Sequence, residues 1–237
     1  MSNSYEQKGF YSYMTSRSGI RELSESRYNL TIGATLTWGF FLNYLLLQFA
    51  APALLSRLYA SPSGYSGFMI FFLIGYFVLV MIGNSMVRSY DPVRCFLGYN
   101  LIAVPVGLVA AIAAAGYNPE LVTRTALITA IVTLSMMIVS TLFPFVFQNM
   151  APALGTSLLI VLIVELISTF FFRVSSSLLD WAVVAIMCLY IGYDWVRANS
   201  VQRTTTNAIA AASALYLDII NLFLRLLRIL ARSRRDD

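Results

Sequence analysis

Long apolar runs recur along most of the chain and are separated by short polar connections. A helix needs about 20 apolar residues to cross the hydrocarbon core of a bilayer, and the runs have about this length. Several connections carry Pro, Gly or Asn, which are typical of turns. The pattern therefore predicts an all-α integral membrane protein with seven transmembrane helices. The predicted helices cover residues 29–54, 64–87, 94–115, 120–143, 149–172, 178–199 and 207–230.

The composition agrees with this pattern and leaves little room for a soluble domain. Of the 237 residues, 59% are hydrophobic and 11% are charged, whereas about 25% of the residues in a soluble domain are charged. The sequence predicts a polar N-terminal tail at 1–28, a membrane domain at 29–230 and a charged C-terminal tail at 231–237. The tail at 1–28 has no apolar run of the kind that a cleavable signal peptide needs.

The basic residues predict the orientation, because cytoplasmic loops of membrane proteins carry an excess of Lys and Arg. Eight basic residues fall on the side of the N-terminus and three on the other side, which predicts a cytoplasmic N-terminus. Seven full crossings would leave Arg232, Arg234 and Arg235 on the outer side. Either this protein is an exception to the charge rule, or the last helix does not cross the membrane fully and returns to the side from which it entered. The net charge of +5 fits orientation better than binding to nucleic acid. The first group is Lys8, Arg17, Arg21, Arg27, Arg88, Arg94, Arg197 and Arg203, and the second is Arg57, Arg124 and Arg173.

Two aspartates, Asp194 and Asp218, lie inside the last two apolar runs, 12 residues either side of Thr206. The polar stretch 204–207 is expected to turn the chain, so both acids would lie roughly 18 Å from the turn and face each other. Acidic residues inside a membrane are costly and usually functional. Two carboxyl groups that share a proton have strongly coupled pKa values. Since the chain has no histidine, a pH response near neutrality would have to come from such carboxylates.

The leading hypothesis for this pair is a pH-sensitive cation site. Loss of a shared proton leaves two like charges that repel or that recruit a divalent cation. Ligands that are all oxygen suit Ca²⁺ or Mg²⁺, and the chain lacks the His and paired Cys motifs of a transition-metal site. We therefore expect no resident cofactor and only transient Ca²⁺ binding. A structural interpretation also stays open, in which one Asp accepts a packing hydrogen bond and the other pairs with an Arg.

The last predicted helix is expected to be central and shielded from lipid, because it carries polar residues and its first half is made of small ones. Polar or small residues on this helix recur at spacings of three and four, which puts them on one face. A matching stripe on the preceding helix would complete a polar seam around the two aspartates. The stripes are Ala211, Ala214, Asp218, Asn221 and Arg225 on one helix, and Met187, Tyr190, Asp194 and Arg197 on the other.

Other polar residues receive more local interpretations. Glu165 lies in a continuous apolar run, so it should face the bundle interior, where it either lines a permeation path or is protonated and hydrogen-bonded. Glu120 and Asp180 lie at helix beginnings, where a negative charge favours the helix dipole. Asp91 precedes a proline and is expected in a turn. Cys95 and Cys188 are expected to be small buried thiols rather than a disulfide.

No enzyme signature accompanies these residues, and we expect a protein that is not an enzyme. The chain has no G-x-S-x-G, no P-loop and no H-E-x-x-H. An intramembrane aspartyl protease would also need two membrane aspartates, and Tyr193-Asp194 resembles the YD motif of those proteases. Their second motif is GxGD, however, whereas here Tyr216-Leu217-Asp218 stands in its place.

Three segments carry a family likeness: Leu178–Ala182 (LLDWA), Tyr193-Asp194 and Ala214–Arg228 (ALYLDIINLFLRLLR). They resemble the transmembrane Bax inhibitor motif family, whose members are similar to Bax inhibitor-1. The resemblance implies six helices wrapped around a central seventh, a di-aspartyl pH sensor at Asp194 and Asp218, and a pH-dependent Ca²⁺ leak across the lipid bilayer. It also implies a latch arginine at the end of the second helix, where Arg88 is the nearest candidate.

The expected function is thus a Ca²⁺ leak channel gated by the two aspartates. The alternative is a non-conducting membrane regulator, since some relatives bind membrane proteases or cell-death regulators. We expect a monomer in a bacterial plasma membrane, with a eukaryotic endomembrane such as the endoplasmic reticulum as the alternative.

Overall fold

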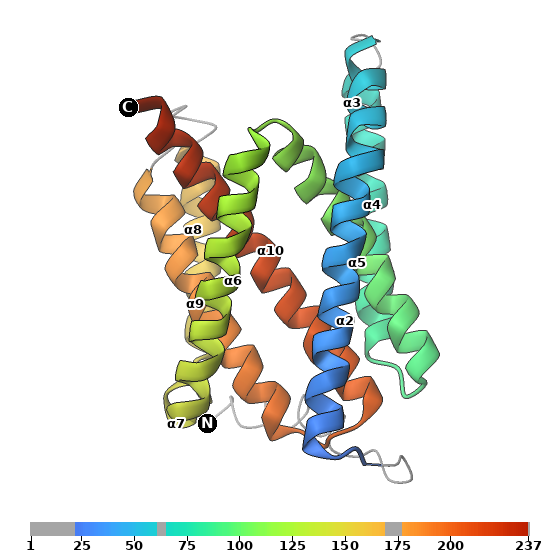
Figure 1. Cartoon of the computed structure of the whole chain (residues 1–237), viewed down its shortest axis with the longest axis vertical. Coiled ribbons are helices and arrows are strands. Elements are labelled where there is room, and N and C mark those ends of the chain that lie inside the picture. Colours follow the sequence, from blue (N-terminus) through green and yellow to red (C-terminus); the bar gives the residue numbers. More distant parts are fainter. Residues whose placement is uncertain (1–21, 61–64, 169–176, 237) are drawn as a thin grey trace. The chain divides into compact units, whose positions relative to one another are not determined.

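The regular structure in the described part of the chain is entirely helical. The structure is a computed structural model, and it describes residues 22–60, 65–168 and 177–236. Residues 1–21 of the predicted tail and 169–172 of the fifth predicted helix lie outside this part. The helices, drawn in Figure 1, are α2 (Glu25–Leu45), η1 (Leu46–Ala50), α3 (Ala51–Ala60), α4 (Tyr65–Val87), α5 (Pro92–Ala115), α6 (Pro119–Leu142), α7 (Pro144–Phe147), α8 (Ala151–Ile167), α9 (Ser177–Ser200) and α10 (Thr205–Asp236).

The all-helical prediction is confirmed, and most predicted helix ends lie within a few residues of the observed ones. Among the described residues, four helices are long and apolar enough to cross a membrane, and two further apolar helices are shorter, at Phe72–Val87 and Ala151–Ile167. The finer arrangement, six helices around a central seventh, stays a prediction. The four long helices are Glu25–Ser56, Pro92–Ala115, Pro119–Leu142 and Leu178–Ser200.

The first helical run contains a π-helical turn, η1, between α2 and α3. Pro52 is the second residue after this turn, and proline has no N–H to donate to a carbonyl in the preceding turn. A π-turn is one of the ways in which a helix continues past such an interruption. The run from Glu25 to Ala60 therefore stays helical beyond the predicted end at residue 54.

Local capping sets where two of the helices begin. Both carboxylate oxygens of Asp91 accept backbone N–H groups, from Val93 and from Arg94, each at 3.2 Å. The Asn118 side chain accepts the N–H of Glu120 at 2.9 Å, at the start of α6. Such caps satisfy N–H groups that have no partner inside the helix. The expected turn at Asp91 is thus a helix cap.

The chain divides into two compact units, and α10 contributes to both. One unit consists of Met1–Val109 with Arg197–Tyr216, and the other of Ala110–Val196 with Leu217–Asp237. α10 is a continuous helix of 32 residues, which corresponds to a length of roughly 48 Å. This length exceeds the thickness of the hydrocarbon core of a bilayer, about 30 Å. The helix also has no break at which the chain could turn back.

In the first unit, hydrogen bonds bring three segments together. The distribution of basic residues predicts that all three lie on the same side of the membrane. The hydroxyl of Tyr28 donates to the carbonyl of Ala198 at 2.9 Å, which joins α2 to the end of α9. The thiol of Cys95 donates to the carbonyl of Val87 at 3.0 Å, and it lies 3.5 Å from that of Thr206. The start of α2, the connection between α4 and α5, and the connection between α9 and α10 therefore meet at one end of this unit.

Neutral hydrogen bonds and ring packing hold the first half of α10 in the same unit. The hydroxyl of Tyr216 lies 2.7 Å from Oδ1 of Asn43 and 3.1 Å from the carbonyl oxygen of Ala103. The Tyr216 ring also meets that of Tyr99 edge to face, with centroids 5.8 Å apart. Both tyrosines are fully buried. Helix α10 is thus anchored two residues before Asp218.

In the second unit, close contacts fix α9 on either side of Asp194. The indole N–H of Trp195 donates to the hydroxyl of Thr141 at 2.9 Å, which joins α9 to the end of α6. Gly192 lies against the ring of Phe147 so closely that a Cβ would overlap it. The absence of a side chain at Gly192 is therefore what allows α9 to approach α7 next to Asp194.

The close approach of α4 and α5 gives a stability prediction at Gly83. A Cβ at this position would lie 2.7 Å from the carbonyl oxygen of Gly98 and 2.8 Å from the Ile102 side chain. Gly83→Ala should lower the free energy of unfolding by about 1–3 kcal/mol, because the backbone of α5 would have to move. Gly75→Ala, on the same helix, meets nothing within 4 Å and should leave stability unchanged or slightly raised. Denaturant titration of purified protein in detergent measures both, and equal effects would contradict the assigned packing.

Candidate functional site

Asp194 on α9 and Asp218 on α10 are both buried in the second unit, with exposed fractions of 7% and 9%. Both carboxyl groups lie within electrostatic range of the Tyr190 hydroxyl, one turn before Asp194 on α9. The structure therefore brings the two predicted acids into one neighbourhood around this tyrosine. The Tyr190 hydroxyl also borders α8, because a Cβ at Gly155 would lie 3.8 Å from it. Sharing of a proton between the two acids stays a prediction.

The turn between α9 and α10 does not lie where the sequence pattern placed it. α9 ends at Ser200 and α10 begins at Thr205, so Thr206 is inside a helix. The prediction that both acids lie at equal distances from the turn is therefore wrong. Asp194 lies six residues before the end of α9 and Asp218 thirteen residues after the start of α10, which are roughly 9 and 20 Å along the helices.

The corrected turn explains why Tyr190 lies near both acids. Counted from the helix ends, Asp218 is level with Met187 of α9. Tyr190 follows Met187 by three residues and precedes Asp194 by four, so it lies between the two levels. A tyrosine hydroxyl can donate one hydrogen bond and accept others. Tyr190 therefore lies at an intermediate level along α9, within electrostatic range of both carboxyl groups.

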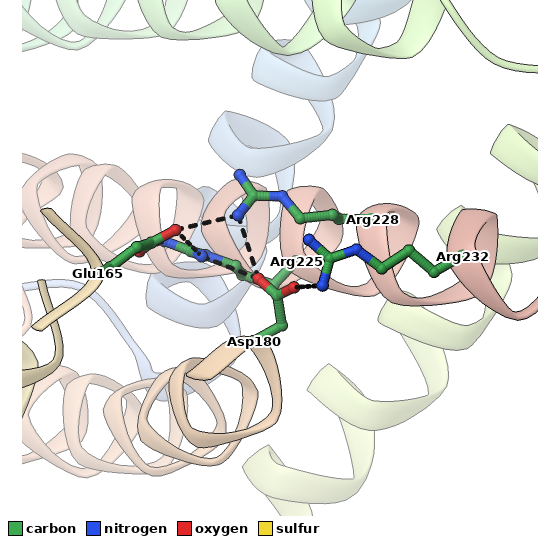
Figure 2. A network of polar contacts seen from close by, with 5 residues as sticks. All are labelled: Glu165, Asp180, Arg225, Arg228 and Arg232. Carbon is green, nitrogen blue, oxygen red and sulfur yellow. Dashed lines mark hydrogen bonds and ion pairs between the residues drawn. The ribbon is translucent and has the colours of Figure 1, made fainter. Parts of the chain in front are cut away.

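A second cluster of ionisable side chains lies in the same unit, and we call it the arginine network: Glu165, Asp180, Arg225, Arg228 and Arg232. Figure 2 shows the three α10 arginines gathered around the two acids, which come from α8 and α9. Arg225 donates to both carboxylate oxygens of Glu165, at 2.7 and 2.6 Å, and to Oδ1 of Asp180 at 3.0 Å. Such two-pronged pairing is the strong geometry for an arginine and a carboxylate.

The other two arginines complete the network on the Asp180 side. Nη1 of Arg228 lies 3.0 Å from Oε1 of Glu165 and 3.1 Å from Oδ1 of Asp180. Nη1 of Arg232 lies 2.9 Å from Oδ2 of Asp180. All three arginines therefore contact Asp180, whose side chain is only 2% exposed. Two acids face three guanidinium groups, so the fully ionised network carries a net positive charge.

The network changes the interpretation of three residues. Glu165, expected to line a path or to be protonated and hydrogen-bonded, is in an ion pair with Arg225. Asp180 does lie in the first turn of α9, but the expectation that it serves only the helix dipole is wrong, because three arginines surround it. Arg225, expected on a seam beside Asp218, has its guanidinium on Glu165 and Asp180 instead.

The remaining candidates are not members of the arginine network. Asn221 is exposed on α10, so the predicted seam does not continue as one buried stripe to Arg225. Arg88 is exposed just after α4, and Arg197 is half-buried near the end of α9; both are assigned to the first unit. A latch role for either stays a prediction. Within the described ranges no three Asp, Glu, Cys or His residues converge as a metal cluster. Cys95 is buried and Cys188 is half-buried, and the two are not joined in a disulfide.

Comparison with known proteins identifies the family of the chain. The protein-family model described as "Inhibitor of apoptosis-promoting Bax1" matches residues 14–235. The chain belongs to this family. The match covers both acids and the arginine network, and it confirms the resemblance that the last two helices indicated.

Similar proteins occur in bacteria and in plants. An uncharacterized membrane protein of Streptococcus pyogenes serotype M1 is 28% identical over 233 residues, which cover 93% of this chain and 97% of that protein. Protein LIFEGUARD 3 of Arabidopsis thaliana is 32% identical over 150 residues, covering 59% and 58% of the two chains. The BI1-like protein of Arabidopsis thaliana is 40% identical over 87 residues, covering 35% and 33%. No solved structure matches the chain.

Sequence reasoning missed the arginine network, although one signal could have found it. Asp180 lies twenty residues before the end of α9, and Arg225 lies twenty residues after the start of α10. Two residues equally distant from the turn of a helical hairpin lie at the same depth. With the turn placed at 201–204, the equal-depth rule that was used for Asp194 and Asp218 would have placed Asp180 opposite Arg225.

The network predicts a large stability cost for loss of its central arginine. Arg225→Gln removes the three hydrogen bonds that the guanidinium donates to Glu165 and Asp180. At about 1.5–3 kcal/mol for a hydrogen bond to a charged group, this should lower the free energy of unfolding by about 3 kcal/mol or more. Arg124→Gln is the matched control, since it removes an ion pair of 2.6 Å with Glu120 on the exposed surface of α6, worth at most about 1 kcal/mol. The free energy of unfolding in detergent distinguishes the two. A small effect at both positions would show that the network does not stabilise this unit.

Proposed function

We propose that the protein is a pH-sensitive leak channel for Ca²⁺ and other cations, whose opening is set by the protonation of Asp194 and Asp218. One observation supports this proposal: two buried acids, on different helices of a membrane protein, lie within electrostatic range of the same tyrosine hydroxyl. Acids at such positions are rare in membrane helices and usually serve ion or proton pathways. The chain supplies no histidine that could take this part.

The chemistry of the acid pair follows from its burial. Two carboxylates close together in a low-dielectric environment do not readily ionise together, so in the proposed closed state the pair holds one proton. With that proton present, the site has little excess negative charge with which to attract a cation. Without it, two carboxylates and a tyrosine hydroxyl form an oxygen-rich site of the kind that Ca²⁺ prefers. Ca²⁺ is here a permeating substrate, held briefly by Asp194 and Asp218.

The proposed topology has seven crossings, with α10 surrounded by the other helices and the N-terminus in the cytoplasm. Its support is the burial of α10, in which Leu215, Tyr216 and Leu222 are fully buried. The meeting of the α2 start with the α9–α10 connection supports a common side for these segments. The streptococcal relative favours a bacterial plasma membrane. We propose a monomer that conducts without a cofactor or an enzymatic step.

The acid pair gives a direct test in liposomes. Asp194→Asn and Asp218→Asn should each abolish the pH dependence of Ca²⁺ leak, because an amide cannot titrate in this range. The measurement is release of Ca²⁺ from proteoliposomes, followed by an indicator dye across a series of pH values. Asp91→Asn is the matched control, because Asn caps a helix as well as Asp does and should leave the pH profile unchanged.

Two outcomes would contradict the proposal. Unchanged pH dependence in both acid variants would exclude gating by this pair. Absence of Ca²⁺ leak from wild-type proteoliposomes at every pH would exclude a channel, and it would favour the non-conducting regulator that acts through membrane partners.

A further inference from the structure

We propose that Asp180 is a positioning residue for the cation site: through the arginine network it holds the end of α10 against α8 and α9, and so fixes where Asp218 lies. The inference rests on the proposed function in one respect, because the site that Asp180 positions is the Asp194–Asp218 pair. Its structural content, the placement of α10, stands on the ion pairs alone.

Asp180 is the centre of the network because each of its oxygens has arginine partners. Oδ1 contacts Arg225 and Arg228, and Oδ2 contacts Arg232, at distances of 2.9 to 3.1 Å. The three arginines are spaced three and four residues apart, so they share one face of α10. One carboxylate of α9 therefore holds three successive turns of the neighbouring helix.

Glu165 supplements Asp180 but does not replace it. It contacts Arg225 and Arg228 from α8, and its side chain is 24% exposed, against 2% for Asp180. Loss of the Asp180 charge would leave three guanidinium groups facing a single carboxylate. Like charges repel strongly where water is excluded, so the last turns of α10 would move away from α9.

This motion would reach Asp218 through the helix itself. Arg225 follows Asp218 by seven residues, which is about two turns or 10 Å along the same face of α10. On α9, Asp180 and Asp194 are likewise parts of one continuous helix. The two helices thus lie close together at two levels. At one level the ion pairs of Asp180 join them, and at the other both acids lie within electrostatic range of Tyr190. As long as the first connection holds, Asp218 keeps its place beside Tyr190.

The placement of α10 can be measured without any flux assay. Spin labels on cysteines introduced at Leu134 of α6 and Asn221 of α10, both exposed, report the distance between these helices in the second unit. Cys95 and Cys188 are replaced by serine in this background. Asp180→Asn should shift or broaden the distance distribution, and Asp180→Glu, which keeps the charge, should retain most of the wild-type distribution. Glu120→Gln removes the exposed ion pair of α6 and should change nothing.

The same variants, with all labels omitted, are then compared in the proteoliposome assay. At the pH where the wild-type protein leaks least, Asp180→Asn should raise the leak rate by about tenfold, the change produced by a modest shift between two states. Asp180→Glu should restore the low rate, which general damage to the fold would not predict. Where Asp180→Asn does not yield folded protein, Glu165→Gln serves in its place, with a smaller effect in the same direction.

The two readouts separate failure of this inference from failure of the proposed function. An unchanged distance distribution in both Asp180→Asn and Glu165→Gln would overturn the positioning role, whatever the flux. A changed distribution with no rise in leak, while wild type conducts, would also overturn it. A changed distribution in a protein that never conducts would support Asp180 as the holder of α10 and would overturn the channel instead.

Discussion

An ionised side chain inside an apolar bundle must find an opposite charge or give up its own charge, and the second unit of this protein depends on that constraint. Removing a charge from water costs several kcal/mol even after relaxation. Glu165 and Asp180 meet the constraint with three arginines. Asp194 and Asp218 are also buried, and both lie within electrostatic range of the Tyr190 hydroxyl. Because arginine stays charged at all physiological pH values, the first group of acids is suited to hold helices, and the response of the second group to protons belongs to the proposed channel.

The helices could be predicted from the sequence because their signals are local. Runs of span length identify the helices, and the caps that the structure shows at Asp91 and Asn118 are likewise made with residues close by in the sequence. The sequence pattern predicts the turn before α10 a few residues too late, because the same types of polar residue occur in turns and at the N-terminal caps of helices. The hydroxyl of Thr204 accepts the N–H of Asn207 at 3.2 Å, so the polar stretch 204–207 caps α10 and continues into it. A shift of a few residues in this turn changes which residues of α9 and α10 share a depth.

The candidate site could be predicted in its residues but not in its pairings. Asp194, Asp218 and Tyr190 stand out because they interrupt apolar runs, and the structure brings them together. Arg225 stands out for the same reason, yet its partners come from α8 and α9, 60 and 45 residues away in the chain. Side-chain spacing on one helix gives the face that a residue occupies, but the helix that covers this face is a property of the tertiary fold.

Helix α10 joins these observations, because it is fixed by two different kinds of interaction on either side of Asp218. Before the acid, Tyr216 is held by Asn43 and Ala103 through neutral groups that do not titrate near neutral pH. After it, Arg225 is held by ion pairs that also persist in this range. In the proposed channel, a change in the protonation of Asp218 would thus act on a part of α10 that each unit holds by contacts of its own. The resulting repulsion or attraction would be directed at Tyr190 and Asp194, within the second unit.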